Sequence, residues 1–232
     1  MRYIIILLVF LCNINTIVAQ DFQDIIDKVT NKYENTKSYE SKVKYTLYED
    51  SISKVVKDQL YGKLYKDEDN YHLKIKTSEI VKAKDFYLKI SHSEKMLQYS
   101  KTNKGVENNT DQTPFITLID QFEDKQIKDK GELWELVFTK KKKASPYNKI
   151  IIHISKKGYN VVKQVYYLSA SYEKKYDSNA TNTKKERLEI IEVSFKENPK
   201  RDNSVFNLSK YLINKDNKYT LSSYLEGYKI IF

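Results

Sequence analysis

The sequence contains very little cysteine, proline, glycine and tryptophan. Cys12 is the only cysteine among 232 residues, and glycine, proline and tryptophan occur five, three and one times. A single thiol excludes an intrachain disulfide, and a chain that loses its N-terminal segment also loses the possibility of a thiolate metal site or a cysteine nucleophile. The fold must therefore be stabilised by its hydrophobic core and its hydrogen bonds.

Long apolar runs are also scarce, and the one clear example is N-terminal. Arg2 precedes an apolar stretch over residues 4–11, and residues 17–19 end on a small residue before Gln20. This pattern predicts a secretion signal peptide over residues 1–19 and a soluble, exported chain from residue 20. A lipoprotein signal at Cys12 is the alternative, but bulky Leu11 precedes this cysteine, which lies within the apolar run. No later stretch is apolar for the roughly 20 residues that span a bilayer.

Catalytic and metal-binding patterns are missing as well. The three histidines, His72, His92 and His153, are far apart in the sequence, and neither a nucleophile elbow nor a phosphate-binding loop is present. The acidic run at residues 67–69 lacks the glycine and the distal glutamate of a calcium loop, which favours a solvated turn. We therefore predict a protein that is not an enzyme and that has no cofactor and no metal.

Positive charge is in excess. The 41 basic and 31 acidic residues give a formal net charge of +10, and removing residues 1–19 deletes only Arg2, which leaves 10 − 1 = +9. A basic surface can attract nucleic acid, anionic lipid head groups or acidic partners, and export argues against nucleic acid. The densest run is Lys140, Lys141, Lys142 and Lys143. We interpret it either as a solvated hairpin tip or as a docking patch for a negatively charged partner.

Aromatic residues are abundant and follow a strand-like pattern. The 20 tyrosines and nine phenylalanines suit pleated strands that have one wet face. The N-terminal segment at residues 21–36 has helical periodicity, whereas period-two alternation predicts a mainly antiparallel sheet. The tail from residue 206 predicts one or two short strands or a docked extension. The predicted strands cover residues 39–47, 60–64, 71–75, 80–90, 96–100, 134–138, 150–154, 161–170 and 188–195.

A second helix is expected around residues 113–122. Thr113 is a suitable N-cap, Pro114 suits the first helical position, and the apolar side chains recur at helical spacing. This apolar stripe is either plain core or the wall of a container for something apolar. Its members are Phe115, Ile116, Leu118, Ile119 and Phe122.

Several short motifs together resemble the LolA-like family, the periplasmic outer-membrane lipoprotein carrier proteins. Residues 112–119 resemble the family's Thr-Pro-Phe helix opening, and residues 62–65 its Gly-x-Leu-aromatic strand. The resemblance covers about residues 21–210. The other motifs, in the family's order, are residues 90–99, 134–139 with the lysines that follow, 149–154, 157–161, 187–195 and 205–206.

The resemblance implies one domain from residue 20 to residue 232, with an extension from about residue 211. It implies an incomplete antiparallel barrel wrapped over a few helices, with an apolar cavity that shelters lipid acyl chains in the periplasm. The lid helix, which would bind lipid, would use Pro114, Phe115, Ile116, Leu118, Ile119 and Phe122. The cavity wall would use Leu64, Leu73, Ile75, Trp134, Leu136, Ile152 and Ile154.

The partners that the resemblance implies are acylated lipoproteins or other lipids, an inner-membrane lipoprotein-releasing transporter and an outer-membrane acceptor. A monomer is expected. The chain departs from the family at residues 66–69, where the latch arginine is missing, and its tail beyond Tyr211 has no counterpart. A non-enzymatic periplasmic sensor or protein-interaction module on the same fold is the alternative, and an exported hydrolase is a third hypothesis.

Overall fold

The computed structural model describes residues 22–102, 119, 121–141, 145–169, 185–216 and 218–232, and strands dominate them. Residues 22–35 form a continuous α-helix, close to the helix predicted at residues 21–36. No helix of the described part is both long and apolar enough to cross a membrane.

The strands follow one another along nearly the whole described chain. They are β1 (Ser38–Tyr48), β2 (Val56–Asp67), β3 (Asn70–Ile75), β4 (Ser78–Lys82), β5 (Phe86–Ser91), β6 (Met96–Lys101), β7 (Phe122–Lys130), β8 (Leu133–Lys141), β9 (Tyr147–Ser155), β10 (Val161–Leu168), β11 (Arg187–Glu197), β12 (Leu212–Lys215), β13 (Lys218–Leu221) and β14 (Lys229–Ile231). Three 3-10 helices, η2 (Asn203–Phe206), η3 (Leu208–Lys210) and η4 (Ser223–Leu225), lie in the C-terminal segment.

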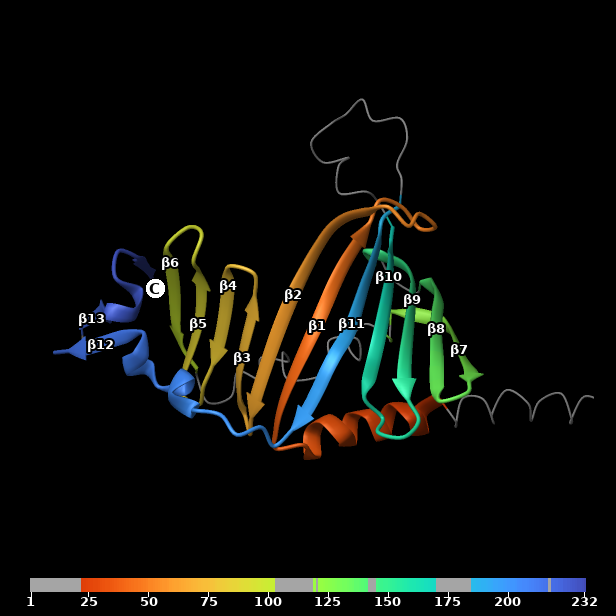
Figure 1. Cartoon of the computed structure of the whole chain (residues 1–232), viewed down its shortest axis with the longest axis horizontal. Helices are drawn as coiled ribbons and strands as arrows, with labels where there is room; N and C mark the ends of the chain where they lie inside the picture. The colour runs from red at the N-terminus through yellow and green to blue at the C-terminus, as the bar shows by residue number, and fades with distance from the viewer. Residues whose placement is uncertain (1–21, 103–118, 120, 142–144, 170–184, 217) are drawn as a thin grey trace, which may run out of the picture. The chain divides into compact units, whose positions relative to one another are not determined.

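Twelve of these strands form one open sheet in the order β14-β6-β5-β4-β3-β2-β1-β11-β10-β9-β8-β7, and β12 and β13 form a separate pair (Figure 1). Because β14 and β7 stand at opposite ends of this order, the sheet is not closed into a barrel. Neighbouring strands pair in antiparallel fashion, as in β9 with β10, whereas β14 joins β6 in parallel. The predicted class, mainly β with an incomplete antiparallel barrel, is confirmed.

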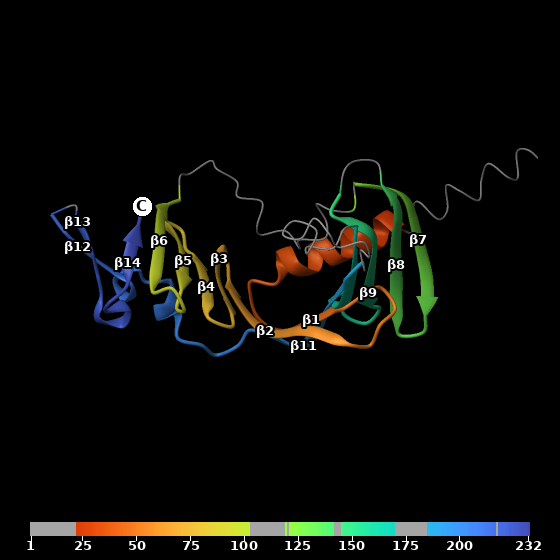
Figure 2. The ribbon, with the colours of Figure 1, turned by 90° about the horizontal axis from the view of Figure 1, so that it is seen from above.

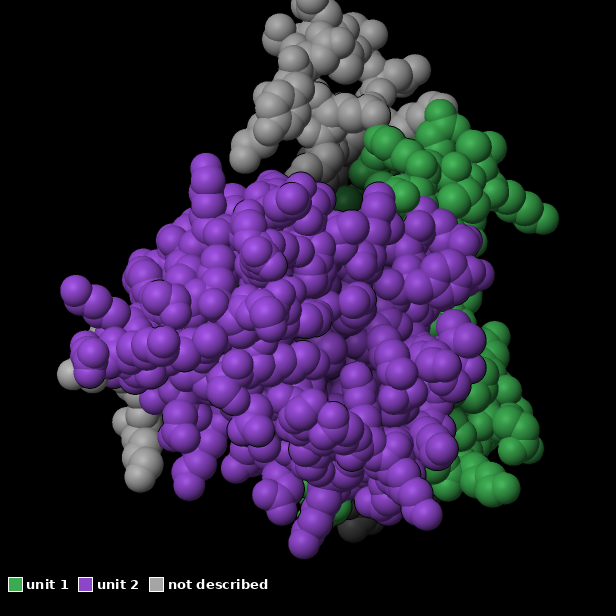
Figure 3. All heavy atoms as spheres, turned by 60° about the vertical axis from the view of Figure 1, so that its left-hand side comes forward, with its two compact units in different colours: residues 1–35, 46–58, 112–191 green, residues 36–45, 59–111, 192–232 purple. Residues whose placement is uncertain are grey.

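The chain divides into two compact units (Figure 3). Unit 1 comprises residues 1–35, 46–58 and 112–191, and unit 2 comprises residues 36–45, 59–111 and 192–232. Strands β1, β2 and β11 contribute residues to both units. Each unit has a hydrophobic core of its own.

The core of unit 1 lies between the helix at residues 22–35 and one face of the sheet (Figure 2). Phe22, Ile25, Ile26 and Val29 recur on the inner side of the helix and are each at most 6% exposed. Helical spacing puts these side chains on one stripe, which a sheet face can cover. The ring of Phe22 meets the ring of Phe138 edge-on, with centroids 5.7 Å apart.

The core of unit 2 lies between the sheet and the C-terminal segment, residues 203–231. Tyr211 is fully buried, and its hydroxyl donates a hydrogen bond of 3.0 Å to the carbonyl of Val205. Tyr65 of β2 stacks on Phe206 at 5.6 Å. The segment is therefore part of the core of unit 2, and it holds three short strands where the sequence predicted one or two.

Truncating Tyr211 tests how much the fold depends on this docked segment. Tyr211→Ala should lower the free energy of unfolding by about 3 to 5 kcal/mol, because it opens a cavity and leaves the Val205 carbonyl without its donor. Tyr224→Ala is the matched control, since Tyr224 is 47% exposed. Urea titration measures the free energy of unfolding of both variants, and we expect Tyr224→Ala to lower it by about 1 kcal/mol or less. Equal losses for the two variants would contradict the docking.

Candidate functional site

Four of the predicted wall residues belong to unit 1. Leu136, Ile152 and Ile154 are completely buried, and Trp134 is half-buried. Cross-strand pairing sets Trp134 opposite Ile154 and Leu136 opposite Ile152, so all four side chains lie on one face of β8 and β9. This is the face that the helix at residues 22–35 covers. In unit 1 the apolar face is thus filled by the protein's own side chains.

The other three predicted wall residues belong to unit 2 and are only half-buried. Leu64, Leu73 and Ile80 lie directly opposite one another on β2, β3 and β4, and Ile75 lies opposite Gly62. Their neighbours in sequence, Tyr65, His72 and Val81, face the C-terminal segment instead, because successive side chains of a strand point to opposite sides. Unit 2 therefore carries apolar side chains on both faces of its sheet.

Gly62 shapes this half-buried face. A Cβ atom at Gly62 would lie 2.9 Å from Cε2 of Tyr45 and 3.1 Å from Cγ2 of Val43. A glycine within a strand suggests a bend or bulge, but β2 and β3 keep a regular register around Gly62. The missing side chain instead leaves room for the side chains of Tyr45 and Val43. Tyr45 of β1 is half-buried, and its burial raises the pKa of its hydroxyl.

The predicted lid is described only at its end. Pro114, Phe115, Ile116 and Leu118 lie outside the described residues. Ile119 is helical and 6% exposed, and it packs in the core of unit 1.

The prediction that Phe122 belongs to the same helix is wrong, since Phe122 is the first residue of β7 and pairs with Lys141. An apolar side chain at this position is compatible with a helical stripe and with the start of a strand. In the structure the strand brings the ring of Phe122 against the ring of Phe138, with the two centroids 6.2 Å apart.

The predicted docking lysines lie at the far end of β8. Lys140 and Lys141 are its last residues, and Lys142 and Lys143 lie outside the described part of the chain. Strand β9 returns antiparallel to β8 after them, as the predicted hairpin requires.

A buried polar centre that the sequence did not reveal lies in unit 2. The carboxylate of Glu79, 3% exposed, is 2.9 Å from Nε2 of His72, 2.9 Å from Nε2 of His92 and 2.8 Å from Nζ of Lys74. Nδ1 of His92 lies 2.8 Å from the hydroxyl of Tyr228 in the C-terminal segment. Two of the three histidines, far apart in sequence, thus meet at one carboxylate.

The hydrogen bonds of this centre hold parts of unit 2 together. Burial by itself raises the pKa of Glu79, but hydrogen bonds from His72, Lys74 and His92 outweigh it and hold the pKa well below the ordinary value of 4.5. Both carboxylate oxygens are already engaged, and in the described residues no group of three acidic, histidine or cysteine side chains is placed to hold a metal ion. The Glu79 centre therefore ties β3, β4 and the turn after β5 to the C-terminal segment.

Replacing Glu79 with glutamine tests this role. The pKa of Glu79 is lowered by folding, so its stabilising contribution is present above the unfolded value of about 4.3 and is lost as the pH falls through the folded pKa. Glu79→Gln should therefore lower the free energy of unfolding at neutral pH by about 3 kcal/mol, and its difference from the wild type should narrow below about pH 4.

Urea titrations over a series of pH values measure this difference. Glu94→Gln, in the exposed turn between β5 and β6, is the control and should follow the wild type throughout. A Glu79→Gln protein as stable as the wild type at neutral pH would show that the centre contributes nothing to the fold.

Comparison with known proteins gives likenesses in structure only. No family model matches the sequence, and no curated protein matches it significantly. An uncharacterised conserved protein from Thermus thermophilus is similar at a TM-score of 0.47 and 12% identity, over 85% of this chain and 97% of that one. The MucB protein of Pseudomonas aeruginosa, solved in complex with MucA, is similar at 0.46 and 8% identity, over 87% of this chain and 63% of that one.

A LolA superfamily protein from Nitrosomonas europaea is similar at a TM-score of 0.34 and 11% identity, over 79% of this chain and 96% of that one. At these scores a likeness carries no argument about a ligand, so function has to be argued from the chain's own side chains. The LolA superfamily, whose motifs the sequence resembles, is represented among the solved structures to which this chain is similar.

Proposed function

We propose that this protein is a non-enzymatic periplasmic carrier that shelters lipid acyl chains, in the first place those of lipoproteins, for transfer to the outer membrane. The observation that carries the proposal is the half-buried apolar face of unit 2, which we call the open face. It consists of Val43, Tyr45, Leu64, Leu73, Ile75 and Ile80.

The open face differs from an ordinary solvent side of a sheet. An antiparallel sheet that has one face in its core usually presents polar side chains on the other. In unit 2 the core face is already filled by the C-terminal segment, yet Leu64, Leu73 and Ile80 continue an apolar row across three strands on the opposite side. A contiguous apolar surface of this kind marks a place where something apolar binds.

An acyl chain fits such a surface better than a polar ligand does. Each buried methylene contributes about 0.8 kcal/mol, so a long chain can be held without a single hydrogen bond. The charged side chains of the Glu79 centre are engaged with one another and lie on the other side of the sheet. The open face therefore offers apolar contact, and Lys89, opposite Ile80 on β5, borders the apolar row on the same side of the sheet.

The remaining parts of the carrier are proposed from the sequence. The segment with Pro114, Phe115, Ile116, Leu118 and Ile119 would act as the lid over the acyl chains. The lysines at 140–143 would meet a negatively charged docking partner. By resemblance, a lipoprotein-releasing transporter would load the carrier and an outer-membrane acceptor would unload it.

One observation favours the alternative, a protein-interaction module. The C-terminal segment and the residue that follows it have three exposed apolar or aromatic side chains, Tyr224, Ile231 and Phe232, which are 47%, 42% and 74% exposed. Aromatic side chains on a surface are typical anchors for a protein partner. A module of this kind would carry no lipid after purification, and that difference separates the two functions.

Organic extraction of the purified protein, followed by mass spectrometry, is the first test. A carrier should yield lipid in near-stoichiometric amount, and in a separate assay the protein should release lipoproteins from spheroplasts. A folded protein that carries no lipid and releases no lipoprotein would contradict the proposed function.

A charged substitution on the open face tests whether acyl chains bind there. Leu73→Asp should weaken the binding of a fluorescent fatty acid by about tenfold or more, because the ionised carboxylate must be desolvated beside the acyl chain. Tyr61→Asp, on the same sheet but at a side chain 62% exposed, is the control and should bind as the wild type does. The affinity of Leu73→Ser, a milder change, should lie between the affinities of Leu73→Asp and Tyr61→Asp. Circular dichroism checks that all three variants are folded, and equal affinities would exclude the open face as the site.

A further inference from the structure

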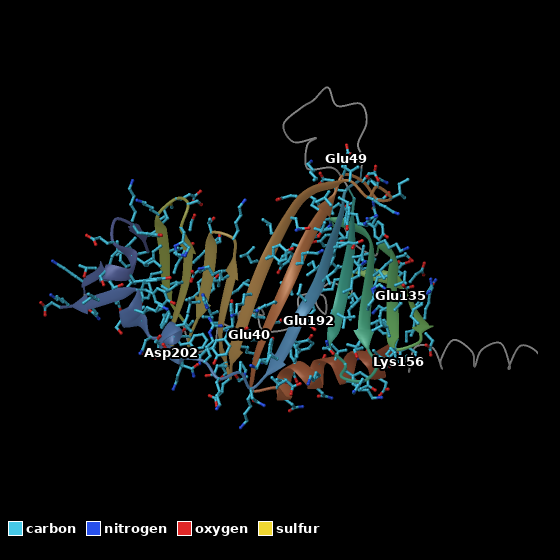
Figure 4. The ribbon with its side chains drawn as sticks, in the orientation of Figure 1. Glu40, Glu49, Glu135, Lys156, Glu192 and Asp202 are labelled. Carbon is cyan, nitrogen blue, oxygen red and sulfur yellow. The ribbon has the colours of Figure 1, made fainter. Side chains whose placement is uncertain are left out.

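The connection between β1 and β2 in unit 1 exposes large apolar side chains at the end of a protrusion. Ile52 is 88% exposed, Val55 60% and Val56 48%. We call these three residues the apolar tip. The connection projects past the strand ends, and Glu49 marks its start (Figure 1, Figure 4). Turns at such a position usually consist of polar residues.

Several backbone groups of this loop are hydrogen-bonded within the loop itself. The carboxylate of Asp50 accepts hydrogen bonds from the amides of Ile52 and Ser53, at 2.9 and 2.6 Å. The hydroxyl of Ser53 accepts from the amide of Val55 at 2.9 Å, and the carbonyl of Val55 accepts from the amide of Glu49 at 3.1 Å.

Arg187 of β11 secures the loop from the side. Its guanidinium donates to the carbonyls of Ser51 and Ser53, at 2.7 and 3.1 Å, and lies over the ring of Tyr48 at 4.2 Å. The tip is therefore held in one conformation before it meets a partner, so binding costs little ordering entropy.

We propose that the apolar tip inserts into the interface of an anionic lipid bilayer and holds the protein there transiently. Backbone polar groups that leave water need partners within the protein, and the bonds to Asp50, Ser53 and Arg187 supply such partners for part of this loop. A convex tip also buries its side chains on all sides in a bilayer, which deforms around it.

The charges around the tip are of both signs, whereas the chain as a whole is basic. Lys54 is exposed between Ile52 and Val55, and the whole chain has a formal net charge of +10. Glu186 is bound to Lys57 at 2.7 Å, and the carboxylate of Asp50 is engaged with the loop backbone. Glu49 and Asp58 are also close to the tip in sequence, so the attraction to an anionic membrane comes from the net charge of the whole chain. This inference concerns membrane contact and does not depend on which cargo the protein carries.

Flotation with phosphatidylcholine vesicles, with and without phosphatidylglycerol, tests the proposal on the full chain, expressed with its N-terminal segment. The wild type should float with the anionic vesicles. A triple variant, Ile52→Ser, Val55→Ser and Val56→Ser, should lose about tenfold or more of its partitioning, and because these residues are exposed, the fold should be unchanged. Val193→Ser, at a residue 58% exposed on β11, is the matched control and should partition as the wild type does.

A fluorophore at the tip reports on the environment directly. Ile52→Cys in a Cys12→Ser background, labelled with an environment-sensitive dye, should show a blue-shifted emission on anionic vesicles, and lipids with spin labels on their acyl chains should quench it. Three results would overturn the proposal. They are unchanged flotation of the triple variant, no quenching by such lipids, and a blue shift that grows with protein concentration without vesicles, which would assign the tip to a contact between two copies.

Discussion

The structure depends on the covering of apolar sheet faces. In unit 1 the cover is the helix at residues 22–35, whose inner side chains pack on Leu136, Ile152 and Ile154. In unit 2 it is the C-terminal segment around Tyr211, which the Glu79 centre also ties to the strands through His92 and Tyr228. Without cysteine pairs, burial has to supply most of the stability. In the part of the chain that the structure describes, the open face of unit 2 is only half-buried.

An incomplete cover gives the proposed function its physical basis. Leu64, Leu73 and Ile80 form an apolar row beside Gly62, where the missing side chain lets Tyr45 approach closely. Such a surface gains free energy from any acyl chain that reaches it. The membrane contact proposed for the apolar tip at Ile52 would bring the protein to the bilayer in which such acyl chains are anchored. Binding and delivery then require contact and release but no bond chemistry.

The sequence predicts the fold well and the polar centre not at all. Alternation around Tyr39, Leu73 and Ile152 identifies their strands because period two is a strong signal. Strand β7 escapes prediction, since its residues are mostly charged and only Phe122 and Ile127 are apolar, as suits a strand at the end of the sheet. The Glu79 centre depends on register across β3, β4 and β5, which sets His72, Glu79 and His92 together and which spacing along the chain does not reveal. The C-terminal segment packs through tertiary contacts, which its local pattern encodes only weakly.

Photo-crosslinking with a fatty acid that carries a diazirine near its methyl end tests the central claim most directly. After irradiation and digestion, mass spectrometry locates the residues that the acyl chain touches. The account predicts adducts on the open face, at Leu64, Leu73, Ile75 or Ile80 and their neighbours on the same side of β2, β3 and β4. Adducts confined to the C-terminal segment, or none above the level of a soluble control protein, would contradict it.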